Sequence, residues 1–372
     1  MAARPRGFVG LAFGALLLAG AGLLLADAAQ AMPPTPPAQP LDGPGGSRLA
    51  HADLRQWHGG SQGNEYWVFT PAAPVPQAAP LVVFVHGWSV MQPDLYRAWI
   101  EHIVRRGAIV LYPRYQQNLK TPAGEFLPNA AEAVRQGIAE LQSGRLGVRA
   151  DLQRLAYVGH SAGGLIASGL AAGYQRLGLP RPRALFAVEP GRSQGPRWRQ
   201  VPLEPLAGIP AGTLLLTLCG DEDERVGCDD ARRIFEESSQ VAAADKNLLL
   251  LRSDRHGSPP LLANHAAPTA PRFDPRYPPS DSGSWLLQRV QERQRRRQAE
   301  GHALQHNALD TDALDWYGPW KLFDALCDAA FLGRNRDYAL GGGRAQLSMG
   351  LWSDGTPVRE LQLLAPGAAA HR

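Results

Sequence analysis

Short apolar segments alternate with segments of helical spacing between residues 64 and 254 of this 372-residue chain. Continuous apolar runs such as 81–85 are typical of strands buried on both faces of a parallel sheet. The expected strands are 65–70, 81–85, 108–112, 155–158, 184–188, 212–218 and 247–252, and the expected helices are 94–106, 130–142, 162–177, 229–237 and 315–332. This alternation predicts an α/β fold with a mostly parallel sheet of about eight strands and helices on both faces.

The N-terminal residues have the pattern of an export signal. Arg4 and Arg6 precede an uncharged apolar run at 8–26, and Ala29-Gln30-Ala31 then offers small residues at the two positions that a signal peptidase recognises. We expect residues 1–31 to be a cleaved signal peptide and the mature protein to be periplasmic or secreted. The alternative is an uncleaved anchor helix, because the run approaches the roughly 20 residues needed to span a bilayer.

The rest of the chain divides by composition. Residues 32–47 are rich in proline and glycine and are expected to form a disordered linker, with a disordered tail at 365–372. We expect a single domain over 48–364. Within it, prolines interrupt the segment 258–315, which we interpret as an insertion that is either lid-like or a passive surface loop.

The charge pattern argues against one class of partner. The formal net charge is +4, part of it lies in the signal segment, and no stripe of basic and aromatic residues occurs. We therefore expect no nucleic-acid binding. We also expect no stable membrane span after signal cleavage, and the sequence leaves the oligomeric state open.

Three cysteines occur in the chain. Cys219 and Cys228 are close in sequence and could close a small disulfide loop in an oxidising compartment, the alternative being two separate buried thiols. Cys327 has apolar, helical surroundings in the sequence, and we expect it in the core.

The run Gly159-His160-Ser161-Ala162-Gly163 matches the pattern G-x-S-x-G between an expected strand and an expected helix. A sharp strand-to-helix turn lifts a serine hydroxyl clear of the sheet, and the glycines permit so tight a turn. Free N–H groups at the start of the helix can stabilise a developing oxyanion. We therefore predict that Ser161 is the nucleophile of a serine hydrolase.

The loop His86-Gly87-Trp88 follows the expected strand 81–85. In folds of this type, that loop donates the second N–H of the oxyanion hole. We predict the backbone N–H groups of Trp88 and Ala162 as the two donors, with Ser89 as the adjacent candidate.

A serine nucleophile needs a base, and the base needs an orienting carboxylate. Four consecutive acids, 221–224, follow the expected strand 212–218. We favour Asp223 as the orienting acid and keep Asp221 as the alternative. A calcium loop is a weaker reading, because the regular alternating ligands of an EF-hand and its distal glutamate are missing.

The base is expected beyond strand 247–252, in the chain order serine, acid, histidine. His256 is the first histidine after that strand, and His265 follows it nine positions later. We predict His256 as the base, with His265 as the competitor. His302 and His306 could meet on one helix face and share a metal, but no acidic third ligand follows, so we expect surface residues and neither a metal nor a cofactor.

Over about 60–257 the chain resembles the α/β-hydrolase superfamily. His86-Gly87-Trp88, the run 159–164 and Ala187-Val188-Glu189-Pro190 resemble the dienelactone-hydrolase and chlorophyllase-like esterase branches. This resemblance implies an eight-stranded, mainly parallel sheet, a Ser-His-Asp triad and no cofactor. Two features depart from it: Glu189 stands where chlorophyllase-like proteins tend to have aspartate, and 258–315 is long for a simple core.

Together these features predict an exported serine hydrolase that cleaves a small-molecule or lipid-like carboxylic ester through an acyl-enzyme. Two alternatives remain. One is an exported serine peptidase of the same fold, and the other is a catalytically silent binding protein, because a fold by itself does not define a function.

Overall fold

The computed structural model describes residues 32–196, 200–272 and 310–365. The chain divides into two compact units, Met1–Pro33 and Pro34–Arg372. Of the first unit only residues 32 and 33 are described, so the predicted signal peptide lies outside the described residues. No helix of the described residues is long and apolar enough to cross a membrane.

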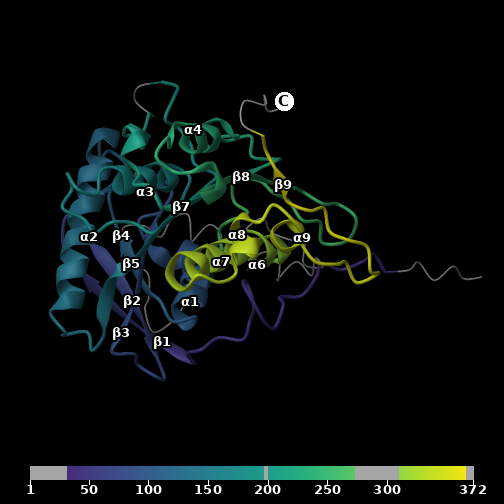
Figure 1. The fold of residues 1–372 in the computed structure, drawn as a ribbon, viewed down its shortest axis with the longest axis horizontal. Helices are drawn as coiled ribbons and strands as arrows, with labels where there is room; N and C mark the ends of the chain where they lie inside the picture. Colours follow the sequence, from purple (N-terminus) through teal and green to yellow (C-terminus); the bar gives the residue numbers. More distant parts are fainter. Residues whose placement is uncertain (1–31, 197–199, 273–309, 366–372) are drawn as a thin grey trace, which may run out of the picture. The chain divides into compact units, whose positions relative to one another are not determined.

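A nine-stranded sheet forms the centre of the second unit (Figure 1), with the strand order β1-β2-β4-β3-β5-β6-β7-β8-β9. The strands β3 to β8 are parallel, and β1, β2 and β9 are antiparallel to their neighbours. The mostly parallel sheet that the sequence predicted is therefore confirmed. Its strands are β1 (Asp53–Gly59), β2 (Tyr66–Ala72), β3 (Ala78–Val85), β4 (Ile109–Pro113), β5 (Arg149–His160), β6 (Ala184–Val188), β7 (Leu214–Gly220), β8 (Lys246–Leu251) and β9 (Gln362–Leu363).

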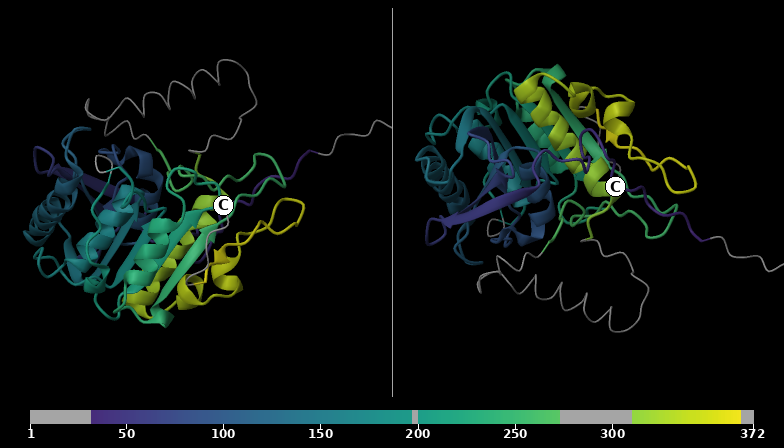
Figure 2. Two further views of the ribbon diagram at one scale, coloured as in Figure 1. Left: turned by 90° about the horizontal axis from the view of Figure 1, so that it is seen from above. Right: turned by 90° about the horizontal axis from the view of Figure 1, so that it is seen from below.

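Helices cover both faces of the sheet. The α-helices are α1 (Arg97–Arg105), α2 (Phe126–Gln142), α3 (Ala162–Ala172), α4 (Asp229–Glu237), α6 (Ala313–Tyr317), α7 (Pro319–Leu332), α8 (Arg336–Leu340) and α9 (Arg344–Leu347). Short 3-10 turns occur at η1 (Pro93–Tyr96), η2 (Ala123–Glu125), η4 (Leu206–Gly208) and η5 (Ala243–Asp245). Figure 2 shows the yellow-green helix α7 running alongside the green strands of the sheet.

The alternation of side chains along each strand produces two cores. Val82 and Phe84 of β3 point to the face covered by α1 and α7, whereas Leu81 and Val83 point to the face covered by α2 and α3. Because both faces are buried, the strands must be apolar at every position, which is why they appear as continuous apolar runs in the sequence.

The strands that the sequence did not predict, β1 and β9, lie at the two edges of the sheet. β1 alternates between exposed and partly buried positions and carries polar residues, so it has no apolar run. β9 has only two residues. The expected helix 315–332 is divided at Gly318 into α6 and α7, and Pro319 occupies the first turn of α7, where its missing N–H costs no hydrogen bond. The short helices α8 and α9 were also missed.

The N-terminal segment corrects one expectation. Residues 34–47, expected to be a disordered linker, pack against the domain. The carbonyl of Pro34 accepts a hydrogen bond from the N–H of Ser258, and the N–H of Gly45 donates to Asp324 Oδ2 at 2.7 Å. Hydrogen bonds to distant parts of the domain therefore hold a segment whose composition alone suggests disorder.

Asp324 of α7 is the buried acceptor for this segment. Its carboxylate also lies 2.8 Å from His102 Nε2 and 3.3 Å from Arg106 Nε, both from the end of α1. Burial alone would raise the pKa of Asp324, but the nearby His102 and Arg106 outweigh burial and lower it. The carboxylate therefore remains charged and ties α1, α7 and the N-terminal segment together.

We expect Asp324→Ala to reduce the free energy of unfolding by about 3 to 5 kcal/mol, because it leaves buried donors without their acceptor. Urea unfolding followed by circular dichroism measures this loss. Asp42→Ala is the control, since the Asp42–Arg48 ion pair is exposed and should leave the midpoint unchanged. Equal midpoints for both variants would contradict this account of the segment.

Candidate active site

Ser161 lies in the turn between β5 and α3 with a left-handed backbone, φ 58° and ψ −128°. The turn is too tight for side chains on either side of it. A Cβ on Gly159 would lie 2.1 Å from the carbonyl oxygen of Gly163, and a Cβ on Gly163 would lie 2.1 Å from that of Val85. The two glycines of the motif are therefore required by packing, and the turn holds the serine at the carboxyl end of the sheet.

A continuous chain of hydrogen bonds joins Ser161 to a histidine and an acid. Ser161 Oγ lies 2.9 Å from His265 Nε2, and His265 Nδ1 lies 2.8 Å from Asp223 Oδ2. In this arrangement Nδ1–H donates to the carboxylate, and Nε2 can accept the serine proton. The three residues come from loops after three different parallel strands, β5, β7 and β8.

Asp223 is held by its own loop. Its Oδ1 accepts hydrogen bonds from the backbone N–H groups of Arg225 and Val226, at 2.9 and 3.2 Å. Asp221, the alternative acid, instead accepts from the N–H and hydroxyl of Ser253. The geometry thus brings Asp223 to the histidine and leaves Asp221 outside the hydrogen-bonded chain.

The position of His256 corrects the predicted base. His256 Nε2 lies 2.8 Å from Asp354 Oδ2, and its side chain is 38% exposed, whereas that of His265 is 16% exposed. The histidine that contacts Ser161 is His265. The expectation of His256 was therefore wrong, and the competing histidine occupies the site.

A local pairing of the chain explains the correction. The backbones of Asp254 and Leu261 exchange two hydrogen bonds of 2.8 Å, so the residues between them form a separate loop. His256 lies on this loop, and its ring contacts the ring of Trp352. The chain then returns to the sheet, where the carbonyl of Ala263 accepts from the N–H of Glu222. Residues 258–272 of the expected insertion therefore supply a site residue, while 273–309 lie outside the described residues.

The loop after β3 is braced beside the serine. The N–H of Ser89 donates to Gln116 Oε1 at 2.8 Å, so Ser89 is not free to act as an oxyanion donor. In the described part of the chain, the N–H of Trp88 has no hydrogen-bond partner. Ala162 is the first residue of α3, so its N–H has no acceptor within the helix. These observations favour Trp88 over Ser89.

His86 stiffens the same loop. It is fully buried, its ring stacks on Tyr115 at 4.0 Å, and its Nδ1 lies 2.7 Å from the carbonyl oxygen of Gly87. Burial lowers the pKa of His86 to about 3. The imidazole is therefore neutral at ordinary pH and serves as a packed support beneath the loop.

Ser161 and His265 open onto a cavity of about 560 Å³. Trp88, Val90 and Leu95 line it with apolar side chains. Four residues at or beside this site have left-handed backbones without being glycine: Ser89, Ser161, Glu189 and Arg192. Strained backbone of this kind concentrates at functional sites, where the surrounding structure holds it in place.

The Cys219–Cys228 disulfide that the sequence suggested is present. It joins the end of β7 to the residue before α4, so it closes the loop that carries Asp223. Cys327 is a free, partly buried thiol of α7 that packs against the core, and burial raises its pKa. His302 and His306 lie outside the described residues.

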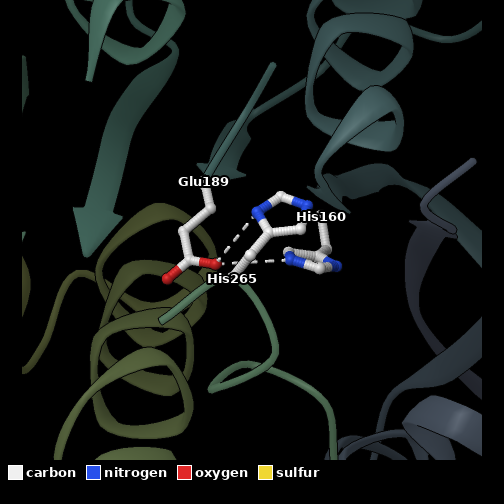
Figure 3. A group of neighbouring side chains, drawn as sticks. All are labelled: His160, Glu189 and His265. Carbon is white, nitrogen blue, oxygen red and sulfur yellow. Dashed lines mark ion pairs between the residues drawn. The ribbon is translucent and has the colours of Figure 1, made fainter. Parts of the chain in front are cut away.

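Three buried residues beside the Ser161–His265–Asp223 chain have no role predicted from the sequence: Tyr96, His160 and Glu189. Tyr96 Oη lies 2.8 Å from His160 Nδ1. Glu189 Oε2 lies 3.4 Å from His160 Nε2, as Figure 3 shows. Two of them occur within sequence motifs described above. His160 precedes the serine in the G-x-S-x-G motif, and Glu189 is in the run Ala187-Val188-Glu189-Pro190 at the end of β6. Tyr96 has no sequence signal, because only the fold brings η1 to this site.

Comparison with known proteins found one family model and several solved structures of low sequence identity. A family model described as chlorophyllase matches residues 61–205, which include Ser161 but neither Asp223 nor His265. No curated protein matches the sequence. Among solved structures, a thermostable esterase from Pseudomonas putida is 19% identical, with a TM-score of 0.41, over 54% of this chain and 72% of the other. A mutant of the esterase rPPE gives the same values.

The strand order, the parallel strands β3 to β8 and the serine turn after β5 are those of the α/β-hydrolase fold. The described residues therefore have the α/β-hydrolase fold.

The two histidines can be separated by substitution. We expect His265→Ala to lower kcat for an activated ester by at least about 10³-fold, because the serine loses its proton acceptor. His256→Ala should retain kcat within about twofold, since that side chain contacts Asp354 instead. Steady-state hydrolysis of p-nitrophenyl acetate measures both, and a large loss in the His256 variant alone would reverse the assignment.

Proposed function

We propose that this protein is an exported serine hydrolase that cleaves carboxylic esters through an acyl-enzyme intermediate. The observation that carries the proposal is the unbroken hydrogen-bonded chain from Ser161 through His265 to Asp223 at the wall of a cavity. A hydroxyl, an imidazole and a carboxylate in this order are the groups that nucleophilic acyl transfer requires.

The first half of the reaction forms the acyl-enzyme. His265 Nε2 takes the proton from Ser161 Oγ as that oxygen attacks the acyl carbon, and the carbonyl oxygen becomes an oxyanion. Asp223 stabilises the imidazolium and fixes its orientation. When the tetrahedral intermediate collapses, the bond to the alcohol oxygen breaks, and His265 returns the proton to the departing alcohol.

The second half repeats these steps with water. His265 takes a proton from the attacking water, hydroxide adds to the acyl carbon, and Ser161 Oγ leaves with the proton from Nε2. In both halves the N–H groups of Trp88 and Ala162 stabilise the oxyanion, a contribution of about 3 to 4 kcal/mol for each donor in comparable sites.

The choice of an ester as substrate rests on two observations. The sequence resembles chlorophyllase-like and dienelactone-hydrolase-like esterases, and the chlorophyllase family model matches the part of the chain that contains Ser161. The cavity presents apolar side chains from Trp88, Val90 and Leu95 beside the serine, which suit an acyl or alcohol group of a small-molecule or lipid-like ester.

The catalytic assignment is tested by covalent labelling and by turnover. We expect a fluorophosphonate probe to label the wild-type protein and not Ser161→Ala. Asp223→Asn should lower kcat for p-nitrophenyl esters by about 10⁴-fold, because the imidazole loses its orienting acceptor. Asp221→Asn is a matched control from the same loop and should stay within about threefold of wild type.

The same assays separate the alternatives. Hydrolysis of peptide anilides in preference to esters would favour the serine peptidase. Absence of labelling in the wild-type protein, or labelling that persists in Ser161→Ala, would contradict the proposal and favour a binding protein without catalysis.

Export is supported by the basic and apolar pattern of residues 1–31 and by the disulfide, which persists in an oxidising compartment. We expect the exported protein to begin at or near Met32. Intact-mass measurement of the protein from the periplasm or medium checks the cleavage site. Recovery of the full-length chain in the membrane fraction would favour the uncleaved anchor.

A further inference from the structure

A buried carboxyl group lies directly behind the Ser161–His265–Asp223 chain. Glu189 follows β6, is 0% exposed and has a left-handed backbone with φ 43°. Neither of its carboxyl oxygens has a hydrogen-bond partner among the described residues, and the same is true of His160 Nε2 beside it. Buried polar atoms are normally hydrogen-bonded, and such exceptions call for an explanation.

The distances show which neighbour Glu189 can serve. Glu189 Oε2 lies 3.4 Å from His160 Nε2 and 3.6 Å from His265 Nδ1 (Figure 3). His265 Nδ1 is already committed to Asp223 at 2.8 Å. His160 Nε2 has no such partner, so a small movement of either side chain would complete a hydrogen bond between Glu189 and His160.

The other nitrogen of His160 contacts Tyr96, which in turn contacts the loop after β3. His160 Nδ1 lies 2.8 Å from Tyr96 Oη, and Tyr96 Oη accepts the backbone N–H of Gly87 at 3.1 Å. Gly87 immediately precedes Trp88, the proposed oxyanion donor. A path of polar contacts therefore runs from Glu189 through His160 and Tyr96 to the loop that holds the donor.

Burial and nearby charges shift the pKa values of Glu189 and His160. Burial, together with the negative charge of Asp223, raises the pKa of Glu189 well above its usual range, against a smaller opposing effect of His265. Burial lowers the pKa of His160 to about 4, against the opposing effects of Asp223 and of the His265 backbone, and Arg225 adds to the lowering. Both shifts favour the uncharged form of the group.

One arrangement pairs the buried groups of this path. Tyr96 donates its O–H to His160 Nδ1, and the same oxygen accepts the N–H of Gly87. The proton of the neutral imidazole is then on Nε2, which faces Glu189 Oε2 at 3.4 Å. A small approach of the two side chains would let Nε2–H donate to Glu189 and would hold His160 against Tyr96.

We propose that Glu189 is a positioning residue that acts through His160 and Tyr96 to hold the Gly87–Trp88 loop in place for oxyanion stabilisation. The inference rests on the proposed function and deepens it. Glu189 does not replace Asp223 in this role, and it touches neither the serine nor the substrate. Glu189 affects the position of the Trp88 N–H, and this donor stabilises charge that develops only in the transition state.

The test compares three variants in steady-state hydrolysis of p-nitrophenyl esters. Glu189→Leu removes the polar group and keeps an apolar side chain of similar size, whereas Glu189→Gln keeps an uncharged polar group of the same length. Tyr96→Phe removes only the hydroxyl oxygen. We expect Glu189→Leu and Tyr96→Phe each to lower kcat by about ten- to a hundredfold, because displacement of a donor weakens transition-state binding, with KM within about threefold of wild type.

Rescue and coupling separate positioning from a structural role. Glu189→Gln should restore kcat to within about threefold of wild type, because its amide oxygen can accept from His160 Nε2. The Glu189→Leu/Tyr96→Phe double variant should be no slower than the worse single variant, because both break one path. The Tm of Glu189→Leu should be at or above that of wild type, since it removes a buried carboxyl that has no completed hydrogen bond.

A matched control is present in β5. Tyr157 is also fully buried, and its hydroxyl has no hydrogen-bond partner among the described residues. Its side chain packs in the core on the other face of the sheet from Tyr96. Tyr157→Phe makes the same chemical change as Tyr96→Phe without touching the path, and it should leave kcat unchanged.

Three outcomes would overturn the inference: kcat of Glu189→Leu and Tyr96→Phe within threefold of wild type, multiplicative losses in the double variant, or equal losses in Glu189→Gln and Glu189→Leu. If Glu189→Leu fails to fold, Tyr96→Phe against Tyr157→Phe still decides the role of the path. Failure of the proposed function is distinct, because wild-type protein would then neither hydrolyse esters nor react with fluorophosphonate.

Discussion

The left-handed turn at Ser161 is the constraint on which the rest of the site depends. Its N–H donates to the carbonyl of Val188 at the end of β6, and its own carbonyl accepts from the N–H of Gly164 in the following helix and, at 3.3 Å, from that of Gly191. The turn is thereby tied to the neighbouring strand and helix. Because a Cβ on Gly159 or Gly163 would clash with neighbouring backbone, any other residue at either position would push the turn apart and displace the hydroxyl from the sheet edge.

The parallel sheet supplies the partners of this serine by geometry. The carboxyl ends of β5, β6, β7 and β8 lie at one edge in the order in which the chain makes them. Loops after these strands therefore converge there and bring Glu189, Asp223 and His265 toward one another from distant parts of the sequence. The disulfide at Cys219 and Cys228 limits the freedom of the loop that carries the acid.

Buried polar groups serve two different purposes in this domain. Asp324 is fully provided with donors from Gly45, His102 and Arg106, and it holds segments together. Glu189 is equally buried but lacks completed hydrogen bonds, and it lies beside the Ser161–His265–Asp223 chain. A buried polar group with all its hydrogen bonds stabilises the fold, whereas one that lacks them costs stability, and such departures are expected at functional sites.

The sequence by itself determined the parallel sheet and the serine turn, because buried strands require continuous apolar runs and the turn requires glycine at particular positions. It also narrowed the acid to one loop and the base to two histidines. Only the tertiary structure decided between His256 and His265. The choice depends on the pairing of Asp254 with Leu261, because that pairing places His256 on a loop away from Ser161 and lets His265 reach the serine. The same holds for the contact of Tyr96 with His160 and for the packing of residues 34–47: each depends on elements that meet in space and leave no local pattern in the chain.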